Sequence, residues 1–287
     1  MTSRRLAVWL VLMGFLLAAT VQGSNAAFSG RAPEAASFSA YGNFNDFSRI
    51  TNVSAAASSS LVWWLDSSKP ATVFSDATCT TPTPVGGSVQ CWTDRRPGHS
   101  NLLAVAAAQR ASTPIAGQAP IRFAGGAAMT GPDLLASTGT VTIFFVFREN
   151  VRLANFVFSL NGIITTSPGR FTLHAPWTDG NVFLDAGDTG QNRAHTPTNT
   201  ITTGTPALLG AWKDPVYGHN RVQIDRKQIF DSTGYTVAST VGGIRVGALG
   251  SYSSNHDFAE ILVFSSTLSD TDRYHVAQYL QTKWGTP

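Results

Sequence analysis

The sequence predicts an all-β fold, a two-sheet antiparallel sandwich that ends in one short helix. About ten short runs of β-branched and aromatic residues recur along the chain at the spacing of a sandwich, separated by turns. The 287 residues include 26 Gly and only 13% charged residues, which favours turns and strands over long helices. The last strand signal is followed at once by a helix signal. With 43% hydrophobic residues, the chain has enough apolar surface for one large domain.

The first 26 residues are typical of a secretory signal peptide. Arg4 and Arg5 precede an apolar run over 6–19 that is short for a membrane span, and small residues at 24–26 offer a cleavage site. An uncleaved membrane anchor is the alternative. Without this segment the chain keeps 18 basic and 17 acidic residues, a formal charge of +1. We therefore predict a secreted or extracellular protein, or one of the periplasm or cell surface, with no membrane span after cleavage and no nucleic-acid partner.

Residues 27–60 are rich in Ala, Ser and Asn and are expected to form a low-complexity arm or linker. Four aromatic residues recur in it at every third position, namely Phe38, Tyr41, Phe44 and Phe47. They could line one side of a helix or hold an extended arm on an apolar surface, and a flexible leader with scattered aromatics is the alternative. An ordered arm would be a candidate segment for homo-oligomer formation or for binding another protein.

The globular domain is expected to span 61–287, opening with a strand at 62–66. Cys79 and Cys91 flank a turn-rich connection, and in an exported chain they are expected to form a disulfide. In the chain-entropy model, closing so short a loop stabilises the fold by about 3 kcal/mol. Two cysteines alone do not make a metal site, which would need two more soft ligands.

The strongest strand signal is Val-Thr-Ile-Phe-Phe-Val-Phe at 141–147, which is β-branched and aromatic throughout. Asp179-Gly180 predicts a turn between two other strands. Further strands are expected at 121–123, 156–160, 171–174, 207–212, 221–225, 227–230 and 243–249.

The segment 258–264 is apolar on both alternating faces except for Glu260, which indicates a strand covered on both sides. A helix is expected directly after it. Ser269 is placed to cap its first turn by accepting the Asp272 amide, and Lys283 lies in its last turn before Gly285. The apolar face of this helix is expected to dock on the body of the protein through Val276, Tyr279, Leu280 and Trp284.

Three motifs resemble the laminin G-like, concanavalin A-like lectin-glucanase superfamily domains of secreted bacterial or phage proteins. They are Trp-Leu-Asp at 64–66 followed by Trp-Thr-Asp at 92–94, His-Ala-Pro-Trp-Thr-Asp-Gly at 174–180, and Asp-Phe-Ala-Glu-Ile-Leu-Val-Phe at 257–264 with the helix after it. The resemblance covers roughly 61–285 and implies a jelly-roll sandwich. Two positions depart from it. Ala124 replaces an Asp of that family, and Asp225-Arg226 replaces the Asp-Gly or Asn-Gly of a hairpin, so a different turn is expected there.

The sequence carries no recognised catalytic motif. Asp257 and Glu260 are the nearest to a pair of sugar-cleaving carboxylates, but a separation of three predicts opposite faces of a strand. For Glu260 we expect a carboxylate held by hydrogen bonds within the sandwich or at its lip. Neither a Gly-x-Ser-x-Gly elbow nor a phosphate-binding glycine loop is present. We therefore predict a non-catalytic protein, with a glycan-degrading enzyme of unrecognised site as the less favoured alternative.

Two sets of residues combine an aromatic ring with directional polar groups, as sugar binding requires. The first set is Trp177, Asp179, Asn181 and Asp185, and the second is Trp212, Tyr217, His219 and Asn220. Either tryptophan could instead fill the core. In the first region Asp179, Asp185 and Asp188 are also candidate calcium ligands, although turn formation explains Asp179 and Asp188 without a metal.

These observations, together with the resemblance, predict an exported, non-catalytic, lectin-like module. Its partner would be a glycan or a cell-surface polysaccharide, bound for recognition or adhesion. The alternative is a structural or assembly protein that binds other subunits through 27–60. Calcium is the one cofactor that the sequence suggests.

Overall fold

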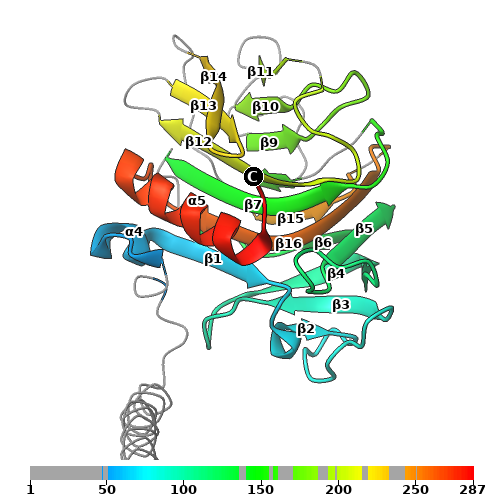
Figure 1. Cartoon of the computed structure of the whole chain (residues 1–287). Coiled ribbons are helices and arrows are strands. Elements are labelled where there is room, and N and C mark those ends of the chain that lie inside the picture. The colour runs from blue at the N-terminus through cyan, green and yellow to red at the C-terminus, as the bar shows by residue number, and fades with distance from the viewer. Residues whose placement is uncertain are drawn as a thin grey trace, which may run out of the picture. The chain divides into compact units, whose positions relative to one another are not determined.

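The computed structural model describes residues 47, 51–135, 140–154, 158–160, 171–186, 193–197, 199–214, 219–232, 243–249 and 251–287. Two antiparallel sheets pack face to face, and a single helix closes the chain (Figure 1). This confirms the predicted all-β sandwich with its C-terminal helix. The expected signal peptide and the arm before residue 47 lie outside the described residues. In the part that is described, no helix is both long and apolar enough to cross a membrane.

The first sheet is built around the last and longest strand. Its order is β14 (Lys227–Ser232), β13 (His219–Ile224), β12 (Pro206–Asp214), β7 (Val141–Glu149) and β16 (Ser254–Phe264). On its other side β16 pairs with β5 (Ile121–Gly125) along its first half and with β1 (Leu61–Asp66) along its second half. The strand that the sequence analysis placed at 258–264 therefore begins four residues earlier, at Ser254.

The second sheet has the order β11 (Arg193–His195), β10 (Phe183–Ala186), β9 (Phe171–His174), β8 (Phe158–Leu160), β15 (Ile244–Gly247), β6 (Ala128–Thr130) and β4 (Asn101–Arg110), followed by β3 (Ser88–Thr93) and β2 (Val73–Phe74). A short 3-10 helix, η1 (Pro70–Thr72), precedes β2. The long strand β4 pairs with β6 at its start and with β5 at its end, so its backbone hydrogen bonds link the two sheets.

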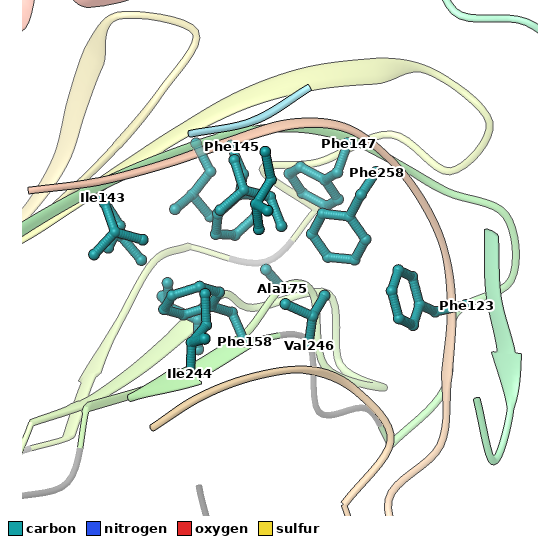
Figure 2. Close-up of a cluster of buried hydrophobic side chains, with 14 of the residues drawn as sticks. Phe123, Ile143, Phe145, Phe147, Phe158, Ala175, Ile244, Val246 and Phe258 are labelled. Atoms are coloured by element: carbon teal, nitrogen blue, oxygen red, sulfur yellow. The ribbon is translucent and has the colours of Figure 1, made fainter. Parts of the chain in front are cut away.

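The inner core lies between the sheets. Figure 2 shows Phe145, Phe147 and Phe258 of the first sheet facing Phe158 and Val246 of the second. The rings of Phe145 and Phe158 stack with their centres 6.1 Å apart. All nine residues of β7 are buried, because one of its faces lines this core and the other is also covered.

An outer core lies on the opposite face of the first sheet, beneath helix α5 (Asp270–Trp284). The short helix α4 (Ala55–Ser60) and Phe47 complete it, and the Phe47 ring centre lies 5.0 Å from that of Trp64. Part of the expected arm thus packs on the domain. The other three aromatics of its stripe lie outside the described residues, so a role of 27–60 in assembly stays a prediction.

Both ends of α5 confirm the sequence analysis. Ser269 Oγ accepts the Asp272 amide as N-cap, and Gly285 ends the helix in the left-handed conformation with φ of 64°. The Asp272 carboxylate also accepts the amide and the hydroxyl of Ser54, at 2.7 and 2.9 Å, which ties the start of α4 to the start of α5.

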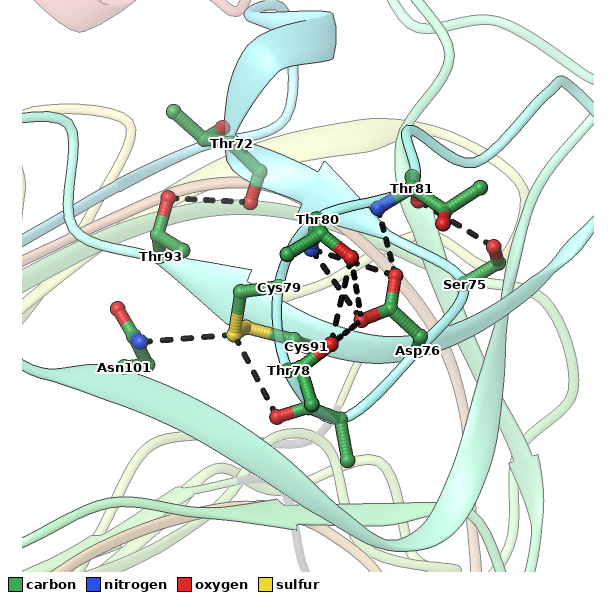
Figure 3. Close-up of a disulfide and its surroundings, with 11 residues drawn as sticks. Thr72, Ser75, Asp76, Thr78, Cys79, Thr80, Thr81, Cys91, Thr93 and Asn101 are labelled. Carbon is green, nitrogen blue, oxygen red and sulfur yellow. Dashed lines mark hydrogen bonds between the residues drawn. A yellow bond between two sulfur atoms is a disulfide. The ribbon is translucent and has the colours of Figure 1, made fainter.

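The disulfide between Cys79 and Cys91 is present, as the sequence predicted (Figure 3). It closes the loop between β2 and β3. Within that loop the Asp76 carboxylate accepts the amides of Thr80 and Thr81 and the hydroxyl of Thr78. These hydrogen bonds, that from Thr78 first, hold the pKa of Asp76 below its usual range.

The hairpin between β13 and β14 corrects one expectation. Asp225 and Arg226 form a two-residue turn with φ of 48° and 66°, which are the positive angles that Asn-Gly adopts in such a hairpin. The hairpin therefore has the two-residue turn with positive φ at both positions that Asn-Gly normally forms, although its residues are Asp225 and Arg226. Asp225 sustains it, since its amide donates to the Leu208 carbonyl and its carboxylate accepts the Leu208 amide.

Candidate functional site

Trp177 differs from the other tryptophans of the described chain. It is half-buried, whereas the remaining five are all at most 3% exposed: Trp63, Trp64, Trp92, Trp212 and Trp284. A tryptophan ring contributes much apolar area when it is buried, and this chain buries the other five almost completely, so the partial exposure of Trp177 sets it apart. Trp177 is therefore the residue around which a binding site is best sought.

The turn between β9 and β10 holds Trp177 in place. Its amide donates to the Asn181 carbonyl at 2.7 Å, and its own carbonyl accepts the Gly180 amide at 2.8 Å. Asp179 accepts the backbone amide of Asn181 at 2.9 Å and its side-chain amide at 3.0 Å. Both Asp179 oxygens are thus used inside the turn.

Gly180 fits this turn because a side chain there would collide with its neighbours. Its φ is 83°, and an added Cβ would lie 2.7 Å from Asn199 Oδ1 and 2.9 Å from Arg152 Nη1. Arg152 donates to the same Asn199 oxygen at 2.7 Å, and the Gly180 carbonyl accepts the Asn199 amide at 3.0 Å. The turn is therefore fixed against a second loop of the chain.

Three segments distant in sequence bring a row of rings together, which we call the aromatic platform: Tyr252, Trp177, Phe183 and His195. Successive ring centres lie 5.5 Å, 6.5 Å and 5.8 Å apart. Tyr252 is 38% exposed, His195 is exposed, and the two middle rings are half-buried. The platform is therefore an open, mainly aromatic surface at one end of the second sheet.

Beneath the platform lies a buried polar pair. His174, whose ring meets that of Trp177 edge-on at 5.0 Å, has its Nε2 3.4 Å from Asp185 Oδ2. Asp185 is fully buried on β10 opposite Thr172 of β9. Of the first predicted set, the turn therefore carries Trp177, Asp179 and Asn181, while Asp185 lies under the surface as a support for His174.

The structure gives no support to a metal centre among the residues it describes. No three His, Cys, Asp or Glu side chains in those ranges come together closely enough to hold an ion. Asp179 is occupied by Asn181, and Asp188, the third candidate ligand, lies outside the described residues.

The second predicted set is not gathered into one site. Trp212 is buried against α5, with the guanidinium carbon of Arg273 4.3 Å from its ring centre. Asn220 is fully buried, and it shares a face of β13 with Val222, which belongs to the inner core. Trp212 and Asn220 therefore point to opposite faces of the sheet. Tyr217 and the side chain of His219 are not described.

Glu260 is held by hydrogen bonds inside the protein, as expected. Its two oxygens accept the indole N–H groups of Trp64 and Trp284, both at 2.7 Å, and the Tyr279 hydroxyl at 2.9 Å. Lys283 Nζ lies 2.6 Å away. Burial, and then the charge of Asp66, raise the pKa of Glu260. This carboxylate serves the packing of α5 and does not face a substrate.

Asp257 and Glu260 correct the expectation that they occupy opposite faces. A bulge between Phe258 and Glu260 shifts the register of β16 against β7. Ala259 and Glu260 both face the outer core as a result, and Asp257 lies on that same side. They still form no catalytic dyad, because Asp257 is buried between Arg122 and Arg148 while Glu260 has its own donors.

The sequence analysis named only Trp177 among the four platform rings, and of the three that it missed the farthest along the chain is Tyr252. It lies in a tight turn before β16, where Tyr252 and Leu249 exchange two hydrogen bonds of 3.0 Å. The sequence places it 75 residues after Trp177, and only the pairing of strands brings the two rings together.

No family model matches the chain, and no curated protein matches it. Solved structures share its fold at low identity. Domain 4 of AbnA, an extracellular arabinanase of Geobacillus stearothermophilus solved with arabinotriose, matches 76% of this chain and 98% of its own length, with 17% identity and a TM-score of 0.52. The binding domain of botulinum neurotoxin serotype D matches 81% of the chain with 12% identity and a TM-score of 0.54. A mutant sialidase of Trypanosoma rangeli matches 82% with 13% identity and a TM-score of 0.53.

At these identities the likeness shows the fold alone, a β-sandwich. The chain spans 56% of the neurotoxin binding domain and 35% of the sialidase. It spans 26% of the NanB sialidase of Streptococcus pneumoniae, at a TM-score of 0.44.

Proposed function

We propose that this protein is an exported, non-catalytic carbohydrate-binding module that holds a glycan on the aromatic platform. The observation that carries the proposal is the partial exposure of Trp177 beside the exposed Tyr252 ring, at 5.5 Å. Sugar rings present apolar C–H faces that pack on aromatic rings, while their hydroxyls need directional donors and acceptors. The exposed His195 supplies such groups at one end of the row. The exposed Asp179 lies two residues from Trp177, and each of its oxygens, which accepts one hydrogen bond from Asn181, can accept another.

The solved structures that share this fold suggest which ligand to test first. The arabinanase domain was solved with arabinotriose, so a neutral oligosaccharide is a ligand that this kind of sandwich holds in at least that protein. The fold does not by itself assign the ligand of this chain. The proposal therefore rests on the platform, and arabinotriose is the probe to test it first.

The state of the buried carboxylates favours binding over hydrolysis. A glycosidase usually needs two carboxyl groups that flank the scissile bond at an open site. Asp66, Asp257 and Glu260 are each fully buried and engaged by cationic side chains. None of the three lies on the platform, so the proposed function is binding without bond cleavage.

The test is titration calorimetry with arabinotriose, extended by affinity electrophoresis on a panel of neutral polysaccharides. We expect the chain to bind at least one of them, and Trp177→Ala or Tyr252→Ala to weaken that binding at least about tenfold, which corresponds to ~1.4 kcal/mol. Tyr274→Ala removes a tyrosine of 47% exposure on α5 and is the matched control, with binding unchanged.

Two outcomes would contradict the proposal. One is unchanged binding in both platform variants, and the other is no retention by the unaltered chain on any polysaccharide of the panel. A chelator arm tests calcium as well. Because both Asp179 oxygens are occupied by Asn181, we expect retention to be the same with calcium and with chelator.

A further inference from the structure

A cavity of about 230 Å³ lies between the β13–β14 hairpin and helix α5. Its lining includes Trp212, Gln223, Arg226, Asp270, Arg273 and Tyr274. Two of these side chains are arginines, and each is stacked on an aromatic ring. The guanidinium carbon of Arg226 lies 4.2 Å from the ring centre of Tyr274, and that of Arg273 lies 4.3 Å from the ring centre of Trp212. The cavity therefore combines positive charge with flat apolar surface.

The two arginines differ in how far their donors are occupied. Arg273 is buried and donates to the Leu268 carbonyl and the Asp270 carboxylate. Arg226 is exposed and donates to Gln281 Oε1 at 3.3 Å. Among the residues the structure describes, Arg226 has no carboxylate within ion-pair distance. It therefore presents guanidinium donors at the cavity.

The backbone at Arg226 adds an independent reason to look here. Its φ of 66° is a conformation that glycine adopts freely and that costs other residues free energy. Such strain persists only where the surrounding structure holds the residue in place, and strained residues cluster at ligand-binding sites. In this hairpin the strained residue places a cation over the exposed ring of Tyr274.

We propose that this cavity binds the carboxylate of an acidic sugar. The planar fork of a guanidinium matches a carboxylate, and stacking on Tyr274 fixes the plane of that fork. The volume is below the range of roughly 300–1,000 Å³ typical of sites for drug-sized ligands, so it suits a single sugar ring. Gln223 and the exposed carboxylate of Asp270 offer acceptors for sugar hydroxyls, which an acidic peptide would lack.

This site shares no residue with the aromatic platform, and the inference does not depend on the glycan bound there. The probe is trigalacturonate, titrated into the full chain and followed by calorimetry, with its methyl ester as the neutral counterpart and triglutamate as a carboxylated peptide. We expect binding of the trigalacturonate alone, weakened as salt is raised. Arg226→Gln should weaken it at least tenfold.

Lys227→Gln is the matched control, because it removes the same charge from the next, exposed position of the hairpin. We expect its affinity for trigalacturonate to stay within twofold. Arg226→Gly separates binding from folding, since glycine relieves the strained φ. It should lose binding as Arg226→Gln does, while its Tm is equal to or above that of the unaltered chain.

Three results would overturn the inference: no binding of trigalacturonate by the unaltered chain, equal losses in the Arg226 and Lys227 variants, or equal binding of triglutamate. The Trp177→Ala variant distinguishes binding at the cavity from binding at the aromatic platform in the same experiment. It should leave trigalacturonate binding intact whether or not the platform binds neutral glycans.

Discussion

Lys283 Nζ lies 2.6 Å from Glu260 Oε2, and the same ammonium lies 2.7 Å from Asp66 Oδ2. Asp66 and Glu260 face each other across the β1–β16 pair, and both carboxylates are fully buried. One cation from α5 thus holds two like charges of the sheet together. Since Trp284 also donates to Glu260, the helix is fastened to the sandwich by this network.

Lys283→Met should therefore destabilise the fold strongly. It keeps most of the side-chain volume but leaves the buried Glu260 without its cation and Asp66 with Arg95 alone, whose Nη1 lies 3.1 Å from Asp66 Oδ2. Breaking a buried ion pair in this way costs about 3–5 kcal/mol. The measurement is urea unfolding at neutral pH. Lys69→Met, at an exposed position, is the control and should stay within about 0.5 kcal/mol. A loss below about 1 kcal/mol for Lys283→Met would contradict the role assigned to the network.

His256 should make stability fall as the solution is acidified. It is fully buried, its Nε2 lies 2.9 Å from the Ala175 carbonyl, and its Nδ1 lies 2.8 Å from Ser254 Oγ. Burial lowers the pKa of His256 to about 4, against an unfolded value of about 6.5. Between these values the unfolded chain binds one proton more than the folded chain. Acidification through this window should therefore cost roughly 3 kcal/mol.

The check is the free energy of unfolding measured between pH 7 and pH 4 for the unaltered chain and for His256→Gln. The variant should lack about 3 kcal/mol of the decrease, whatever its stability at pH 7. His99→Gln, at an exposed histidine, should keep the full decrease. Parallel curves for the unaltered chain and His256→Gln would refute this assignment.

Alanine substitutions at Gly180 and Gly86 separate two contributions to the free energy of unfolding. One is the steric clash of an added Cβ, and the other is the strain of a positive φ. Both glycines have φ of 83°, but an added Cβ meets nothing within 4 Å at Gly86, while at Gly180 it meets Asn199 and Arg152. Gly86→Ala should cost about 1 kcal/mol through its backbone alone. Gly180→Ala should cost distinctly more and should also weaken glycan retention, because its turn carries Trp177. Equal stabilities, with retention intact in both variants, would show that the turn does not position Trp177.

The sequence predicted those elements whose local signals agree with their tertiary surroundings. Ser269 and Gly285 bound α5 as expected, and the β-branched and aromatic run at 141–147 lies in β7. By contrast, β4 was missed. Its Leu-Ala-Val-Ala-Ala-Ala-Gln core has weak strand propensity, and pairing with three neighbouring strands overrides that preference.

The candidate site was predictable in part for the same reason. Trp177 and the turn after it form one local motif, so the sequence placed them together. Two other features depend on pairing between strands and leave little trace in the local sequence. One is Tyr252, which reaches the platform from another segment, and the other is the bulge that moves Glu260 to the face of Asp257.

The contacts of the outer core indicate how far the N-terminus can be shortened without loss of stability. Phe47 is 2% exposed and packs on Trp64 and Phe264, and Ser54 bonds to Asp272 of α5. A chain that begins at Phe47 should therefore match the stability of the full chain in urea unfolding. One that begins at Leu61 should lose at least about 3 kcal/mol, the cost of removing one buried phenylalanine side chain.

This difference decides how assembly through 27–60 should be tested. Deleting that whole segment would remove Phe47 and α4 and so damage the fold, and a change of oligomeric state could then follow from unfolding. Deleting 27–46 leaves the outer core intact. If the arm mediates assembly, this shorter deletion should convert an oligomer to a folded monomer in sedimentation analysis, with the same midpoint in urea. An unchanged oligomeric state would remove residues 27–46 from any role in assembly.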